Sequence, residues 1–183
     1  MSGLDQLGLV VGVADLAVGG AADGRIVTYA LGSCIGLTAF DPATKIGGML
    51  HFMLPQPSAN SDPRGRNHCM YVTTGLPTLL RRLTAAGAEP RRLVLTAAGG
   101  AETLTGRGNM AIGRRNHTML RKALWKMNLR LAGEDIGGAH ARTLSLDLFT
   151  GVVEVRTRAG DRLLWQPGDA DPSCYEPAMA RRR

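Results

Sequence analysis

Residues 25–54 read RIVTYALGSCIGLTAFDPATKIGGMLHFML, and this stretch decides the expected fold. Its apolar and β-branched runs are interrupted at Gly32-Ser33 and at Asp41-Pro42-Ala43-Thr44, which are turn-forming residues. The runs between these breaks predict three successive strands, Arg25–Leu31, Ile35–Phe40 and Lys45–Leu54. Strands that follow one another this closely favour a layered α+β domain over a parallel sheet with alternating helices.

The third of these strands is expected to lie at the centre of its sheet. Successive side chains of a strand point to opposite faces. The two faces are therefore Met49, His51 and Met53 on one side and Leu50, Phe52 and Leu54 on the other. Both faces are mainly apolar, so His51 is expected to be buried and to need a hydrogen-bond partner.

The remaining sequence adds strands, two helices and one long loop. Further strands are expected within Leu7–Val18, Arg92–Ala98 and Leu129–Ile136, with a hairpin over Thr143–Arg158 that turns at Thr150-Gly151. The helices are Tyr71–Ala86, stopped by Gly87, and a second helix capped by Asn116 with the apolar stripe Leu120, Ala123, Leu124 and Met127. The polar segment Pro55–His68 is expected to be a loop, long enough to suggest a function.

Length and composition fit one globular domain. The chain has 183 residues, of which 44% are hydrophobic and 20% charged, so general disorder is excluded. We expect a single domain over residues 1–164 and a flexible tail over 165–183. There is no membrane-length apolar run and no secretory signal, which favours a cytoplasmic location without membrane insertion.

The charge and the cysteines exclude several classes of function. The net charge is +7, but aromatic residues make up only 4% of the chain, so stacking platforms for nucleic acid are scarce and no nucleic-acid partner is expected. The three cysteines, Cys34, Cys69 and Cys174, lack the spacing of a disulfide framework or a zinc site. The glycine-flanked stretch Gly100–Gly108 lacks the lysine of a phosphate loop. Neither a metal nor a cofactor is expected.

The densest group of candidate functional residues surrounds Cys34. A neighbouring imidazole can take the proton of a thiol and make it nucleophilic, and His51 lies on the adjoining strand candidate. The hydroxyl of Thr28 could orient the imidazole ring, and backbone N–H groups near Cys34 could stabilise an oxyanion. The residues alone favour another interpretation, a small buried cysteine and a structural core histidine, because one cysteine and one histidine are a weak signal. A nucleophile elbow is disfavoured, because a strand rather than a helix follows Cys34.

Several motifs lie in a consistent order along residues 9–158. They are Gly12-Val13-Ala14-Asp15, Leu31-Gly32-Ser33-Cys34, Asp41-Pro42, Lys45–Pro55, Gly99-Gly100-Ala101, Ile112-Gly113, Arg115-Asn116, Asp135-Ile136-Gly137-Gly138 and Arg142. Together they resemble the CheD family, chemotaxis proteins that act as receptor glutamine deamidases. The resemblance implies a cysteine hydrolase fold of packed sheets and flanking helices, similar to certain deamidating bacterial toxins.

The resemblance also implies roles for individual residues. The nucleophile of the family falls on Cys34, the catalytic histidine on His51 and the supporting threonine on Thr28. The implied substrates are the cytoplasmic domains of methyl-accepting chemoreceptors, whose glutamines would become glutamates, with hydrolysis of receptor methyl esters as a possible side activity. The implied partner in many species is the CheC phosphatase.

A second hypothesis is a regulatory binding module for a CheC-type phosphatase, with catalysis secondary. Retention of all three implied site residues favours the enzyme. The chain departs from the family at Thr73, where an aspartate is usual, and at Thr96-Ala97-Ala98, where a lysine and a phenylalanine are common before the paired glycines. The second departure weakens the binding hypothesis.

Overall fold

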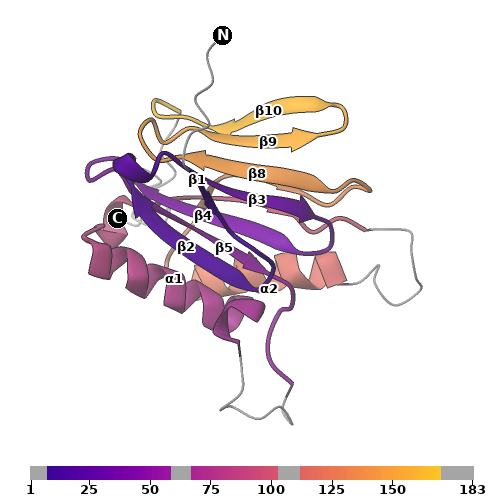
Figure 1. Ribbon diagram of the computed structural model, residues 1–183. Helices are drawn as coiled ribbons and strands as arrows, with labels where there is room; N and C mark the ends of the chain where they lie inside the picture. Colours follow the sequence, from indigo (N-terminus) through magenta and orange to yellow (C-terminus); the bar gives the residue numbers. More distant parts are fainter. Residues whose placement is uncertain (1–7, 59–66, 103–111, 170–183) are drawn as a thin grey trace, which may run out of the picture.

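The computed structural model describes residues 8–58, 67–102 and 112–169. In this part of the chain there are ten strands, two α-helices and three short 3₁₀ helices (Figure 1). The strands are β1 (Gly8–Val10), β2 (Asp15–Gly20), β3 (Arg25–Leu31), β4 (Ile35–Asp41), β5 (Ile46–Phe52), β6 (Val94–Gly99), β7 (Leu131–Ile136), β8 (Arg142–Asp147), β9 (Val153–Thr157) and β10 (Gly160–Trp165). The helices are α1 (Val72–Ala86), α2 (Ile112–Lys126), η1 (Ala21–Asp23), η2 (His68–Met70) and η3 (Pro90–Arg92).

The strands form two mixed sheets. The first has the order β1-β3-β8-β9-β10 and the second the order β2-β5-β4-β6-β7. Within them β1 pairs with β3, and β6 with β7, in parallel, whereas the remaining pairs are antiparallel. The predicted α+β class with packed mixed sheets and flanking helices is confirmed.

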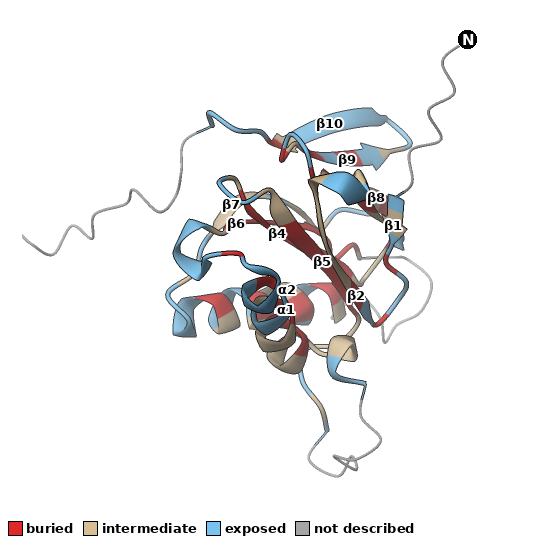
Figure 2. Ribbon diagram, turned by 60° about the vertical axis from the view of Figure 1, so that its left-hand side comes forward, coloured by how far each residue is buried: buried red, intermediate tan, exposed pale blue. Residues whose placement is uncertain are grey.

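The molecule has three layers, with the second sheet in the middle. Figure 1 shows both α-helices on one side of this sheet and the first sheet on the other. The buried side chains form two clusters, one between the helices and the middle sheet and one between the two sheets. Figure 2 shows buried backbone positions along β4 and β5 of the middle sheet. The middle sheet is therefore buried on both faces, and each residue of β4 is buried.

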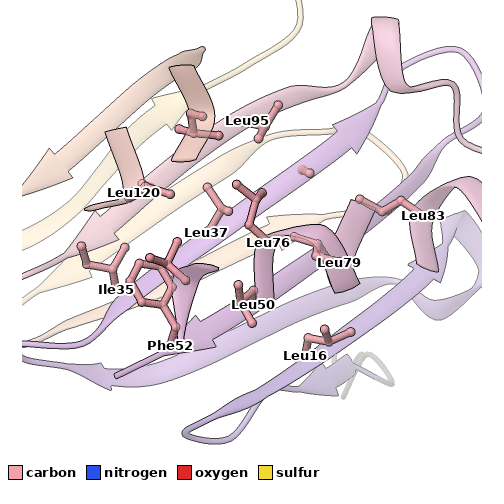
Figure 3. Close-up of a cluster of buried hydrophobic side chains, with 14 of the residues drawn as sticks. Leu16, Ile35, Leu37, Leu50, Phe52, Leu76, Leu79, Leu83, Leu95 and Leu120 are labelled. Atoms are coloured by element: carbon pink, nitrogen blue, oxygen red, sulfur yellow. The ribbon is translucent and has the colours of Figure 1, made fainter. Parts of the chain in front are cut away.

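The alternation predicted for the third strand is confirmed in β5. Leu50 and Phe52 belong to the cluster under the helices, whereas Met49 belongs to the cluster between the sheets. Figure 3 shows Leu76 and Leu79 of α1 packed over the helix-facing side chains of the sheet.

Helix α1 ends at Ala86, as predicted, and begins at Val72, one residue after the predicted start at Tyr71. Leu76, Leu79 and Leu83 form its buried stripe, and Gly87 ends it in the left-handed conformation with φ of 106°. The N–H of Gly87 reaches the carbonyls of Leu83 and Thr84, which would otherwise be unpaired at the helix end.

Helix α2 differs from the expectation. The prediction that Asn116 caps this helix is wrong, because α2 already includes Ile112 and Asn116 lies inside it, fully buried. Asparagine is common at helix N-caps, and its burial for another reason cannot be read from the sequence pattern.

The C-terminal boundary stays a prediction. Strand β10 runs to Trp165, whose side chain is buried in the cluster between the sheets. Residues 170–183, with Cys174, lie outside the described residues, as does the central part of the Pro55–His68 loop, residues 59–66.

Candidate functional site

The structure brings Thr28 and His51 into contact across the two sheets. Thr28 lies on β3 of the first sheet and His51 on β5 of the second, and Thr28 Oγ1 is 2.8 Å from His51 Nδ1. The sequence placed Thr28 on an adjoining strand, but it did not show that this strand belongs to the opposite sheet. The expected hydrogen-bond partner of the buried histidine is thus a residue facing it across the core.

The hydrogen bonds of Thr28 determine which ring nitrogen of His51 carries the proton. Thr28 Oγ1 lies 2.7 Å from the carbonyl oxygen of Val11, which can only accept, so the single hydroxyl proton is donated there. Oγ1 must therefore accept from His51 Nδ1–H. The neutral ring then has an unprotonated Nε2, which is the form able to take a proton.

The environment keeps His51 neutral. Its side chain is 1% exposed, and burial lowers the pKa of the imidazole below the ordinary value of 6.5. Nε2 is buried and has no hydrogen-bond partner among the described residues. A buried acceptor without a partner is unfavourable for stability and is a common feature of functional sites.

Cys34 ends the short loop, residues 32–34, that precedes β4. In the β4–β5 ladder Gly36 pairs with His51, and a Cβ at Gly36 would lie 3.3 Å from Thr28 Cγ2. Cys34 lies two residues earlier in the chain, just outside the strand. Its side chain packs against the cluster between the sheets.

The thiol is protonated at neutral pH. Burial raises the pKa of Cys34 above its ordinary value, and a hydrogen bond from its own backbone N–H acts in the opposite direction. The thiol and the imidazole are therefore both neutral in the free protein.

The Cys34 loop is attached to the end of β6. The N–H of Gly100 donates to the Cys34 carbonyl at 2.8 Å, and that of Ala101 donates to the Gly32 carbonyl at 2.8 Å. Gly99 has φ of 119°, and a Cβ there would collide with the Cys34 carbonyl oxygen. These contacts explain why glycines stand at this point of the chain.

Asn116 also contacts the site, although the sequence pattern predicts a helix cap there. Its side-chain Nδ2 lies 3.0 Å from the Ser33 carbonyl oxygen and 2.7 Å from that of Met53. The pair Arg115-Asn116 was among the motifs that resemble the family, and this was the only available signal.

Among residues 8–58, 67–102 and 112–169 there is no group of His, Cys, Asp and Glu arranged to hold a metal ion.

Comparisons with known proteins show the family of this chain. Residues 53–157 match the family model described as CheD chemotactic sensory transduction. The chain belongs to the CheD family. A protein of Solibacter usitatus named probable chemoreceptor glutamine deamidase CheD is 48% identical over 145 residues, which are 78% of this chain and 85% of that protein.

Other CheD proteins match over a similar length. One from Pyrococcus abyssi, also named probable chemoreceptor glutamine deamidase CheD, is 42% identical over 84% of this chain and 94% of its own length. A further one from Syntrophus aciditrophicus, named probable chemoreceptor glutamine deamidase CheD 1, is 38% identical over 83% of this chain and 95% of its own. Neither α-helix of the described CheD-like domain is long and apolar enough to cross a membrane.

Proposed function

We propose that this protein is a chemoreceptor glutamine deamidase in which Cys34 is the nucleophile, His51 the general base and Thr28 the residue that orients the imidazole. Membership of the CheD family and the names of its relatives support the activity. The observation that carries the residue roles is the buried Nε2 of His51, which is unprotonated because of Thr28 and has no hydrogen-bond partner among the residues that the structure describes.

The reaction begins when His51 Nε2 takes the proton of Cys34 as the sulfur attacks the carboxamide carbon of a glutamine side chain. A C–S bond forms, and the carbonyl oxygen becomes an oxyanion. The imidazolium then donates its proton to the nitrogen, and the C–N bond breaks to release ammonia. Water, deprotonated by His51, attacks the thioester; the C–S bond breaks, and glutamate and the thiol are formed.

The backbone N–H of Cys34 is the candidate donor to the oxyanion. The N–H groups of Gly100 and Ala101 already donate to the carbonyls of Cys34 and Gly32, so they do not serve this role. The Cys34 N–H acts on its own sulfur and lowers the pKa of the thiol. We expect it to donate to the oxyanion that forms when the sulfur attacks.

Ammonia release from an amidated chemoreceptor cytoplasmic fragment tests these roles. Cys34→Ala and His51→Ala should both abolish release while circular dichroism shows a folded protein. Cys69→Ser, which changes another partly buried cysteine, should leave release unchanged. Full activity in the folded His51→Ala variant would contradict the assignment of the base.

The proposal also covers the binding of a CheC-type phosphatase and the cellular location of the protein. Thr96, Ala97 and Ala98, where the family often has larger residues, are all fully buried in β6 and offer no side-chain surface to a partner. This supports the deamidase over the CheC-regulating module. A pull-down with a CheC-type phosphatase decides whether that partner binds, and fractionation decides whether the protein is cytoplasmic.

A further inference from the structure

Asn116 connects the two segments that carry the candidate nucleophile and base. Its amide nitrogen donates one proton to the Ser33 carbonyl, at 3.0 Å, and the other to the Met53 carbonyl, at 2.7 Å. Ser33 directly precedes Cys34, and Met53 follows His51 by two residues. One side chain thus bridges the Cys34 loop and the end of the His51 strand.

The bridge completes the attachment of the Cys34 loop. Three successive carbonyls of this loop, those of Gly32, Ser33 and Cys34, all accept hydrogen bonds. Backbone N–H groups serve the first and the third, and Asn116 serves the middle one. Of these three contacts, the middle one alone depends on the identity of a side chain.

The helix position allows the bridge to form. A Cβ at Gly113 would collide with the Gly100 carbonyl oxygen, so the first turn of α2 packs directly against the backbone that follows β6. Asn116 lies one turn further on and is fully buried. The close approach brings a short side chain within reach of both carbonyls.

The chemistry of the bridge requires a primary amide. An amide nitrogen offers two donors at one point, whereas a serine hydroxyl offers one and a carboxylate none. The two carbonyl partners also fix the orientation of the amide, because Oδ1 would be repelled by both. Oδ1 itself is buried and has no hydrogen-bond partner among the described residues, so the amide is retained despite an unsatisfied acceptor.

We infer that Asn116 is a positioning residue, which sets the separation between the Cys34 thiol and the His51 imidazole by holding the Ser33 and Met53 carbonyls together. This inference rests on the proposed roles of Cys34 and His51. Loss of the bridge leaves the two catalytic side chains intact and loosens their mutual placement. A displacement of about 1 Å between reacting groups can slow a reaction by about 100-fold.

The test compares Asn116→Ala with Leu120→Ala. Leu120 lies one turn along α2, is equally buried and has no polar atom, so its replacement weakens the same helix without removing the bridge. Both variants are made with Cys69→Ser and Cys174→Ser, which leaves Cys34 as the single thiol. The measurements are kcat and KM on a receptor fragment, the pH dependence of Cys34 alkylation, and Tm.

We expect Asn116→Ala to lower kcat at least about tenfold with little change in KM, and to alter the pH profile of Cys34 alkylation. Leu120→Ala should lower Tm while kcat and the alkylation profile stay as in the parent. Equal effects of the two variants on kcat and alkylation would overturn the inference, as would unchanged values in Asn116→Ala.

A second variant covers the case in which Asn116→Ala fails to fold. Asn116→Ser retains one donor, and we expect intermediate values of kcat and of the alkylation rate; values equal to the parent would overturn the inference. Alkylation needs no receptor. An inactive parent protein would therefore count against the proposed function, while the alkylation comparison still decides the role of Asn116.

Discussion

His51 combines three properties at the scale of a single residue: burial, a fixed tautomer and an Nε2 without a hydrogen-bond partner in the described part of the chain. The tautomer follows from two linked hydrogen bonds, the second of which ends at the Val11 carbonyl. Because the donor and the acceptor in each of these bonds are determined, the neutral ring presents an unprotonated Nε2.

Replacing Thr28 tests the orienting role. Thr28→Val keeps the shape of the side chain but removes the acceptor of Nδ1–H, so we expect kcat to fall on the order of 10-fold to 100-fold, less than the loss of the base itself. Thr28→Ser keeps the hydroxyl and should retain most activity. Equal kcat values for the valine and serine variants would show that the hydroxyl does not matter.

The pH dependence of kcat/KM follows from the two pKa directions. Burial lowers the pKa of His51 below 6.5, so the base is lost only as the pH falls through that lowered value. Burial raises the pKa of Cys34 above 9.0, so the thiol proton is lost only in alkaline solution. We expect a broad plateau through neutral pH, measured as initial rates in constant ionic strength. An acid limb with an apparent pKa above 6.5 would contradict this environment for His51.

At the scale of elements, the junction between β6 and the Cys34 loop holds the thiol in place. Gly99 occupies a left-handed conformation and leaves no room for a Cβ beside the Cys34 carbonyl. Gly160 offers a matched comparison, because its φ of 126° is close to the 119° of Gly99 and a Cβ there would meet nothing within 4 Å.

Replacing each glycine with alanine separates the effect of backbone strain from that of the collision with the Cys34 carbonyl oxygen. Gly160→Ala should lower the free energy of unfolding by about 1 kcal/mol through strain alone and keep full activity. Gly99→Ala should destabilise more, by about 3 kcal/mol, and lose activity because the Cys34 loop must shift. Urea denaturation and ammonia release measure the two effects. A fully active Gly99→Ala protein would show that the loop position is not important.

The bounds of the strands could be predicted more fully than the side chains that face one another across the sheets. Arg25–Leu31 has the predicted bounds, because β-branched residues and flanking turn residues are local signals. The facing of Thr28 and His51 across two sheets is a tertiary arrangement, and period-two alternation gives a face but not the strand opposite it. Asn116 was misjudged for the same reason, since its partners lie 83 and 63 residues away in sequence.

At the scale of the whole molecule, an ion pair between the buried Asp41 and the half-exposed Arg92 connects the far end of β4 to the segment after α1. Asp41 is fully buried and accepts two hydrogen bonds from Arg92 and one from the N–H of Glu89. These contacts hold the pKa of Asp41 well below its usual range. Its contribution to stability is present above the unfolded-state pKa of about 3.9 and is lost as the pH falls below it.

Asp41→Asn should lower the free energy of unfolding at pH 7 by about 1–2 kcal/mol, a value reduced by screening because Arg92 is half exposed. The difference from the parent should shrink when the pH is lowered below 4. The Arg156–Asp161 pair has the same two-bond geometry on the surface, so Asp161→Asn should change Tm little. Equal Tm losses for the two variants would contradict the structural role of Asp41.

Conversion of receptor glutamine to glutamate by Cys34 can be measured directly. An amidated chemoreceptor cytoplasmic fragment is incubated with the protein or with Cys34→Ala, and the peptides are mapped by mass. We expect conversion at discrete glutamines with the parent protein and none with the variant. Absence of conversion by the folded parent, or the same conversion with Cys34→Ala, would contradict the claim.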